Sequence, residues 1–328
     1  MPNKSLPLFS IRKHPFYSMK ALAFYALLPF LYLTSLLPFR LLYLLSDVMY
    51  VVVFRLVGYR RRVVEQNLRR AFPRKTEAEI AALVRAYYHF LCDVVLETIK
   101  GLTISERSLK KRLPFSDLSE VHAHWQAGRR IVFILGHWGC WELGGLSISV
   151  HAPQQADIIY RPLSNPYFDR LMKHLRSRLG NRLIPMKQIM RFLITHQQEP
   201  TITIFAADQT PPPQHAHWMW FLNQETGVFP GADKISKKFD MPVFYMRVRK
   251  LRRGYYQIDA ELLASHPRKL PEGEISKRFM RKLEADIQQQ PANWLWSHKR
   301  WKHQRPPQAL WVDERPPAPI VDKPVDKV

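Results

Sequence analysis

The chain has 328 residues, with 50 Lys and Arg against 27 Asp and Glu, which gives a formal net charge of +23. A hydrophobic content of 46% excludes a disordered chain, and 12 Gly beside 26 Pro exclude a collagen-like one. Two cysteines, Cys92 and Cys140, are too few for a disulfide scaffold or a four-thiolate zinc site. The charge predicts an anionic partner, which is nucleic acid, an anionic membrane face, an acidic protein or a phosphorylated substrate.

The N-terminal part contains a long apolar segment after a basic start. Residues 21–39 carry no formal charge, and residues 41–54 carry only that of Asp47. The first of these stretches has about the minimum length for a spanning helix. We expect residues 1–58 to form a membrane anchor that spans the bilayer or lies in one leaflet. A buried pair of core helices is the alternative, and a removable signal peptide is not expected, because no small-residue cleavage site follows.

Two helices are expected next. Apolar residues recur at helical spacing over 63–72, where Pro73 ends the pattern. Thr76 and Glu79 have the spacing of a capping box, which predicts that a second helix starts there and runs to about Lys100.

Short apolar runs then alternate with helical patterns. The strongest run, residues 130–136, is continuously apolar after its first residue, as in a strand buried on both faces. Further strands are expected at 156–160, 201–207, 242–248 and 255–260, with helices at 165–179, 187–196, 233–239 and 275–289. This alternation predicts an α/β fold with a mostly parallel sheet flanked by helices. We expect one α/β domain over 59–305, followed by a Pro-rich, extended or disordered tail at 306–328.

Three polar side chains follow three of the predicted strands. His137 follows 130–136, Arg161 follows 156–160 and Asp208 follows 201–207. Ligands of open α/β sheets bind beyond the carboxyl ends of the strands, so we expect a site there.

Glu142 lies five residues after His137 and is the carboxylate that we expect on the imidazole Nδ1. Such a contact fixes the tautomer and leaves Nε2 to take a proton from a hydroxyl. The alternative is that both residues only cap the turn. Arg161 is expected either to bind a phosphate or carboxylate or to pair with Asp208. Asp208 has a further ordinary role as a turn or helix-capping residue.

Four segments carry a resemblance to a known family. These are GHWGCWELGG at 136–145, YRPLSNPYFDRLMKHLRSRLG at 160–180, AADQTPPP at 206–213 and WLWSHKRWK at 294–302. Together they resemble the bacterial lipid A biosynthesis late acyltransferases, of the lysophospholipid acyltransferase superfamily with its His-x4-Asp/Glu motif. The resemblance covers residues 15–305.

The resemblance implies a membrane-bound enzyme that transfers a fatty acyl chain to a hydroxyl of a lipid A precursor, a phosphorylated glycolipid. The donor would be an acyl carrier protein thioester or acyl-CoA. The enzyme would lie on the cytoplasmic face of the bacterial inner membrane. His137 would be the general base, oriented by Glu142, and the acceptor would attack the thioester directly. Arg161 and Asp208 would bind substrate, and no cofactor or metal is implied. One departure concerns 220–224 and 227–231, which replace a Phe-Phe-Gly type loop of many members.

Other side chains have competing interpretations. Cys140 is either a nucleophile or a small buried residue. Two pairs of histidines, in residues 122–124 and 215–217, resemble metal ligands in strand-like segments, but no cysteine or acidic cluster completes a site. Aromatic residues within 218–221 could line an acyl channel, touch a bilayer or pack in the core.

Other functions compete with acyl transfer. A basic, membrane-associated binding protein without catalysis is one, but the basic residues form no nucleic-acid-binding motif, so no nucleic acid is expected as partner. A hydrolase that activates water with His137 would need a metal or nucleophile that the sequence does not offer. An acyltransferase that acts on another lipid acceptor remains a third possibility.

Overall fold

The computed structural model describes residues 15–313. The first strand is preceded by α1 (Pro15–Leu36), α2 (Phe39–Tyr50), a π-helical continuation of α2 (Val51–Val57), α3 (Arg61–Ala71), α4 (Glu77–Lys100), α5 (Glu106–Arg112) and α6 (Ser119–Gln126). Helix α4 begins as the sequence predicts, because the Thr76 hydroxyl accepts from the Glu79 N–H and the Glu79 carboxylate accepts from the Thr76 N–H.

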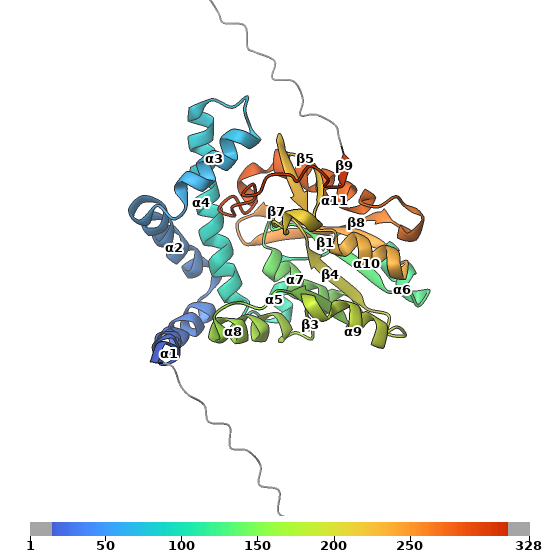
Figure 1. Cartoon of the computed structure of the whole chain (residues 1–328). Coiled ribbons are helices and arrows are strands. Elements are labelled where there is room, and N and C mark those ends of the chain that lie inside the picture. The colour runs from blue at the N-terminus through green and yellow to red at the C-terminus, as the bar shows by residue number, and fades with distance from the viewer. Residues whose placement is uncertain (1–14, 314–328) are drawn as a thin grey trace, which may run out of the picture.

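A six-stranded sheet forms the centre of the molecule (Figure 1). Its strands are β1 (Ile131–Leu135), β2 (Ala156–Tyr160), β3 (Arg182–Pro185), β4 (Ile202–Ala206), β7 (Val243–Arg252) and β8 (Tyr255–Ala264), in the order β3-β2-β4-β1-β7-β8. Neighbouring strands are parallel except for the antiparallel pair of β7 and β8. The predicted mostly parallel sheet is therefore confirmed.

Helices cover both faces of this sheet. The helices that follow α6 are α7 (Trp141–His151), α8 (Pro166–Ser177), α9 (Ile189–Thr195), α10 (Gly231–Phe239) and α11 (Glu274–Gln289). Strand β1 is buried at every position, with Val132 and Ile134 in the core beneath α10 and α11. Ile131, Phe133 and Leu135 face the other core, which includes residues of α7. A strand with two covered faces reads as a continuous apolar run, as the sequence indicates.

The structure also contains a second, smaller sheet, which the sequence does not predict. It contains β5 (His217–Phe221), β6 (Gln224–Val228) and β9 (Trp311–Asp313), in the order β6-β5-β9. Strand β9 lies inside the stretch predicted to be an extended or disordered tail, and it pairs with β5. Residues 314–328 of that tail lie outside the described residues.

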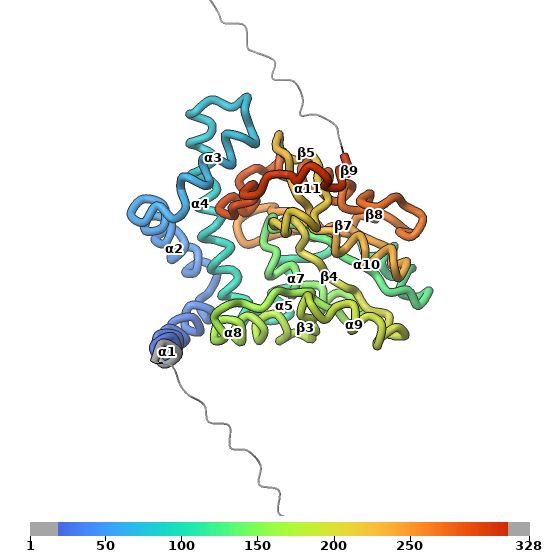
Figure 2. Tube along the Cα trace, in the orientation of Figure 1, coloured from blue at the N-terminus to red at the C-terminus, as the bar shows by residue number. Residues whose placement is uncertain are grey.

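The C-terminal segment before β9 returns to the helices at the start of the chain (Figure 2). The side-chain amide of Asn67 in α3 donates to the carbonyl of Trp296 over 2.8 Å. The N–H of Ser297 donates to the hydroxyl of Tyr87 in α4 over 3.0 Å. These contacts place residues 294–302 between the N-terminal helices and the sheet.

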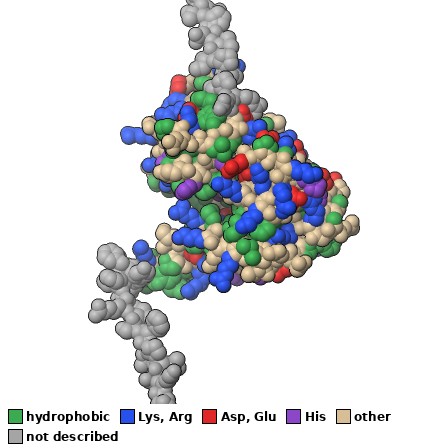
Figure 3. Space-filling model, turned by 45° about the vertical axis from the view of Figure 1, so that its right-hand side comes forward, with side chains coloured by type: hydrophobic (Ala, Val, Ile, Leu, Met, Phe, Trp, Pro, Cys, Tyr) green, Lys and Arg blue, Asp and Glu red, His purple; other side chains and the backbone are tan. Residues whose placement is uncertain are grey.

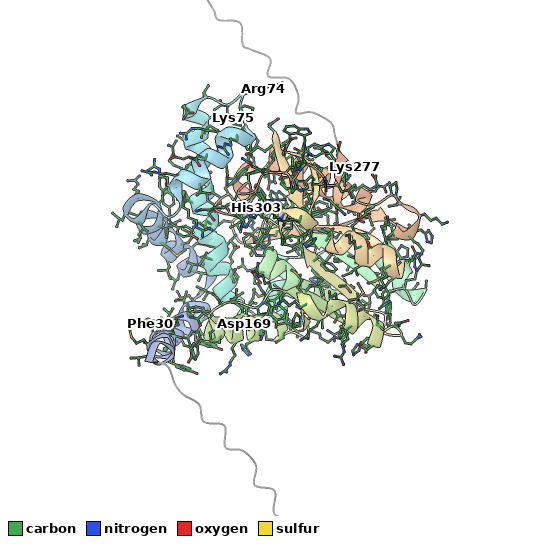
Figure 4. The ribbon with its side chains drawn as sticks, in the orientation of Figure 1. Phe30, Arg74, Lys75, Asp169, Lys277 and His303 are labelled. Atoms are coloured by element: carbon green, nitrogen blue, oxygen red, sulfur yellow. The ribbon has the colours of Figure 1, made fainter. Side chains whose placement is uncertain are left out.

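Helices α1 and α2 expose many large apolar side chains. In α1 these include Leu22, Phe30 and Leu33, which are 73%, 66% and 62% exposed; Figure 4 shows Phe30 on the outer side of the helix. Within the described residues, α1 is the one helix that is long and apolar enough to cross a membrane by itself, over Met19–Leu36. The alternative of a buried helix pair does not describe α1, since only 11% of that stretch is buried.

Helix α2 is nevertheless tied to α4 and to the turn after β7 by ionic contacts. The Arg253 guanidinium, at the turn between β7 and β8, donates to Asp47 of α2 over 2.6 Å and to Asp93 of α4 over 2.7 Å. The hydroxyl of Ser46 donates to the same Asp93 over 2.7 Å. A partly buried network of this kind fixes α2 against α4 and the β7–β8 hairpin.

Candidate active site

The turn between β1 and α7 is built around two glycines. Gly139 has a φ of +68°, and a Cβ at this position would collide with the backbone oxygen of Val248. A Cβ on Gly136 would lie 2.7 Å from a methyl of Leu283 in α11. The turn can therefore pass this close to the backbone of β7 only because Gly139 lacks a side chain. It holds His137 at the carboxyl edge of the sheet.

Asp208 lies directly beside His137, because β4 is the neighbour of β1 in the sheet. The imidazole Nδ1 is 2.6 Å from Asp208 Oδ1, and the backbone N–H of His137 donates to Oδ2 over 2.8 Å. The indole N–H of Trp294 also donates to Oδ2 over 2.8 Å. The carboxylate is 2% exposed and fully engaged by these donors. It fixes the ring so that Nδ1 carries the proton and Nε2 is free to accept one.

The electrostatics of this pair favour its charged forms. Burial alone would raise the pKa of Asp208, but attraction to His137 and the three hydrogen bonds outweigh it and lower that pKa to about 2. Burial alone would lower the pKa of His137, yet the negative charge and hydrogen bond of Asp208 raise it above 6.5. The result is an imidazole that accepts a proton more readily than a free histidine.

The reactive nitrogen of His137 faces the loop after β4. Its Nε2 lies 3.2 Å from the side-chain nitrogen of Gln209. An amide N–H in this place donates to an unprotonated ring nitrogen, which matches the tautomer set by Asp208. The side chain of His137 is 16% exposed, so substrate can reach the ring.

Glu142 does not make the predicted contact with the imidazole. Its carboxylate accepts two hydrogen bonds from the guanidinium of Arg176 in α8, over 2.9 and 2.5 Å. The expectation that Glu142 holds Nδ1 is wrong, because Asp208 occupies that position. Burial would raise the pKa of Glu142, but Arg176 lowers it. The charge of Glu142 still contributes to the raised pKa of His137, after that of Asp208.

Arg161 follows β2 as predicted but stays apart from Asp208. Its side chain is exposed, and within residues 15–313 it makes no hydrogen bond or ion pair. The loop that carries it is held by α8, because the N–H of Leu163 donates to Asp169 over 2.8 Å; Figure 4 shows Asp169 on that helix. Of the two alternatives for Arg161, pairing with Asp208 is therefore wrong, and the side chain is left accessible to an anionic ligand.

One face of the molecule is hollowed and rich in basic side chains. Figure 3 shows a hollow between the upper and lower parts of the molecule, with Lys and Arg side chains along its rim. Ala206 is exposed although it ends a central strand. Solvent therefore reaches the carboxyl end of β4, two residues before Asp208.

Comparison with known proteins decides the family. The model of the bacterial lipid A biosynthesis acyltransferase family matches residues 11–303. The chain belongs to that family.

Its relatives are lipid A acyltransferases of low sequence identity. A lipid A biosynthesis acyltransferase of Haemophilus influenzae is 22% identical, with 81% of this chain and 83% of the relative covered. The lipid A biosynthesis lauroyltransferase of Escherichia coli is 23% identical, with 83% and 89% covered. The corresponding myristoyltransferase of that species is 19% identical, with 75% and 76% covered. The chain is thus an acyltransferase enzyme, and its family acts in lipid A biosynthesis.

In this acyltransferase, Cys140 has the properties of a packing residue. It is fully buried, and burial followed by the nearby charge of Glu97 raises the pKa of its thiol well above 9.0. A thiol in this state is a poor nucleophile.

The histidine pairs of the acyltransferase lie apart from the site. Residues 122–124 belong to helix α6 rather than to a strand, and His217 begins β5, where it contacts Ser276 over 3.1 Å. Within the described part of the chain, no group of three or more His, Cys, Asp or Glu side chains could hold a metal ion. Trp218 and Phe221 are buried in the small sheet, as core residues.

The departure from the Phe-Phe-Gly type loop is a tight hairpin. Leu222 and Asn223 connect β5 to β6 with φ values of 49° and 61°. The left-handed backbone is unfavourable for a leucine. It is supported by Glu284, which accepts from the Leu222 N–H over 2.6 Å, and by Asn223, which donates to the carbonyl of Ala71 over 2.9 Å.

Proposed function

We propose that this enzyme transfers a fatty acyl group from a thioester donor to a hydroxyl of a lipid A precursor. The observation that carries the proposal is His137, with Nδ1 held by Asp208 and Nε2 left unprotonated at the carboxyl edge of the sheet. The donor is an acyl carrier protein thioester or acyl-CoA, and the acceptor is a phosphorylated glycolipid. The match to lipid A acyltransferases over most of the chain supports this choice of substrates.

His137 acts as the general base in the proposed reaction. Its Nε2 takes the proton of the acceptor hydroxyl while the oxygen attacks the thioester carbonyl. The tetrahedral intermediate then collapses, the carbon–sulfur bond breaks, and the imidazolium returns the proton to the leaving thiolate. The products are an ester and a free thiol, and no acyl-enzyme forms. Asp208 stabilises the imidazolium that exists between the two proton transfers.

The other predicted residues have supporting roles in this proposal. Glu142 and Arg176 join the start of α7 to α8 and hold the turn that carries His137. Arg161 binds an anionic group of a substrate, which its exposure and lack of partners within residues 15–313 allow.

The enzyme works at the cytoplasmic face of the bacterial inner membrane in this proposal. The apolar side chains of α1 and α2 insert into the bilayer, and the net charge of +23 attracts anionic lipid headgroups. A vesicle flotation assay with Leu33→Glu tests the insertion, and Leu251→Glu near the end of β7, where Leu251 is 55% exposed, is the matched control. Loss of flotation in the first variant alone supports insertion through α1, and equal flotation of both contradicts it.

The function is tested by acyl transfer in membranes with labelled donor thioesters. Transfer that is lost in His137→Ala, but kept in the control His122→Ala on α6, supports the proposal. Free fatty acid as the main product would indicate hydrolysis. Mass spectrometry of lipid A from cells without the enzyme names the acceptor: one missing acyl chain supports lipid A, and an unchanged lipid A with another altered lipid points to a different acceptor.

A further inference from the structure

Arg300 is buried beside the candidate site without a partner for its charge. The residue is 2% exposed. Within residues 15–313, none of its three guanidinium nitrogens, Nε, Nη1 and Nη2, has a hydrogen-bond partner. Burying a charge in this way is costly unless it is paired and hydrogen-bonded.

Arg176 of α8 shows the usual arrangement of a shielded guanidinium. Its guanidinium donates two hydrogen bonds to Glu142. Arg300 has only the longer-range attraction of Asp208, whose oxygens are already occupied by His137 and Trp294. Burial lowers the pKa of Arg300 to about 10, so the side chain still carries its charge at neutral pH.

The backbone fixes Arg300 next to the loop that follows β4. The hydroxyl of Thr210 donates to the carbonyl of Arg300 over 2.7 Å. The N–H of Leu295, in the same segment, donates to the carbonyl of His137 over 3.1 Å. Both edges of the site, the turn after β1 and the loop after β4, are thus joined to the segment that carries Arg300.

His298, two residues before Arg300, adds no second positive charge to this segment. Burial and the charge of Arg300 lower the pKa of His298 to about 4, so that its imidazole is neutral. The site therefore contains one buried positive charge with several unused donors.

We propose that Arg300 is the receptor for a phosphate group of a substrate that binds beside His137. The inference rests on the proposed function for the identity of the substrate. A guanidinium presents five N–H donors in a planar fork that matches phosphate oxygens. A phosphate offers several acceptor oxygens, whereas a single developing oxyanion would leave most of the donors unused. The phosphate belongs either to the glycolipid acceptor or to the phosphopantetheine arm of the donor.

The first test measures phosphate binding without any reaction. The melting temperature of the full-length protein is measured in inorganic phosphate and in chloride at matched ionic strength, for the wild type, Arg300→Gln and the control Lys299→Gln. Lys299 is exposed, so the control removes the same charge one residue away. We expect phosphate to raise the melting temperature of the wild type and the control by a few degrees and to leave Arg300→Gln unchanged.

The same melts separate a receptor from a structural arginine. Without phosphate, Arg300→Gln should melt at the same temperature as the wild type or higher, because the variant removes an unpaired buried charge. A lower melting temperature, a failure to fold, or an equal phosphate effect in all three proteins overturns the proposal. Arg300→Lys keeps the charge without the planar fork and should lose more than half of the phosphate effect.

The second test identifies the source of the phosphate from steady-state kinetics. Arg300→Gln should raise KM about 10- to 100-fold for the substrate whose phosphate it binds. With a dephosphorylated acceptor, or with an acyl-pantetheine donor that lacks the phosphate, this penalty should disappear for the matching substrate only. A lower kcat with both KM values unchanged indicates an oxyanion role and overturns the proposal. If the wild type transfers no acyl group but phosphate still stabilises it through Arg300, the proposed function fails and the phosphate site stands.

Discussion

Two carboxylates flank the turn that carries His137, and they are held in opposite ways. Asp208, at the end of β4, accepts from the imidazole, from a backbone N–H and from an indole. Glu142, at the start of α7, forms a paired contact with Arg176 of α8. Among the described residues, Asp208 accepts no hydrogen bond from an arginine and can stabilise an imidazolium, whereas the charge of Glu142 is largely neutralised by Arg176. Asp208, at the edge of the sheet, is therefore the partner of the base, and Glu142 with Arg176 has a structural role between α7 and α8.

The largest expected effect follows from Asp208→Asn. The amide has similar size but removes the negative charge that stabilises the imidazolium. We expect kcat of acyl transfer to fall by about 10²- to 10⁴-fold. Steady-state assays with the purified protein measure the loss, and a near-normal circular dichroism spectrum shows that the fold is kept. Activity within a few-fold of the wild type would contradict the role of Asp208 as the partner of His137.

Glu142→Gln should act mainly on stability. It leaves the partly buried Arg176 without its ionic partner, which costs about 1–3 kcal/mol of unfolding free energy. Transfer per folded molecule should fall less than in Asp208→Asn. The double variant Glu142→Gln with Arg176→Gln should regain part of the lost stability, since no unpaired charge remains. Chemical denaturation of the three variants measures this, and a double variant less stable than Glu142→Gln would contradict the structural role.

Gln209→Ala should give the smallest of these effects. Its amide faces His137 Nε2 over 3.2 Å and helps to keep the ring unprotonated there. Loss of one neutral hydrogen bond predicts a decrease in kcat/KM of about 3- to 10-fold. A loss as large as that of Asp208→Asn would mean that Gln209 takes part in the chemistry itself.

Features that depend only on neighbouring residues in the chain are predicted correctly from the sequence. The capping box of Thr76 and Glu79 and the apolar run of β1 depend on neighbours in the chain, and both predictions are confirmed. The sequence predicts His137 and Asp208 as site residues, because polar residues at the carboxyl ends of parallel strands meet at one edge of the sheet. Their direct contact required the order of the strands, which puts β4 next to β1 and which no local pattern encodes.

The same limit explains what the sequence missed. Glu142 is close to His137 along the chain, but its partner Arg176 comes from a different helix, 34 residues later. Trp294 begins the segment WLWSHKRWK, yet its hydrogen bond to Asp208 joins positions 86 residues apart. Strand β9 is only three residues long and depends on β5 for its pairing, so its own residues carry no periodic signal.

The pair of His137 and Asp208 also predicts how stability depends on pH. The lowered pKa of Asp208 stabilises the fold above pH 3.8, and this contribution is lost as the pH falls through about 2. The raised pKa of His137 stabilises the fold below pH 6.5, and this contribution is lost as the pH rises through the folded value. The contribution of this pair to the unfolding free energy should therefore be largest between pH 3.8 and pH 6.5. Unfolding free energies measured between pH 2 and pH 9 check this.

The pKa of His137 in the wild type, Asp208→Asn and Glu142→Gln tests the central claim most directly. It is read from the acid limb of the pH profile of single-turnover acyl transfer, where the base must be unprotonated. Because burial lowers the pKa of His137 and Asp208 is the main group that raises it, we expect the limb to move to lower pH in Asp208→Asn. In Glu142→Gln it should move less. A larger shift in Glu142→Gln than in Asp208→Asn would contradict the assignment of Asp208 as the partner of the base.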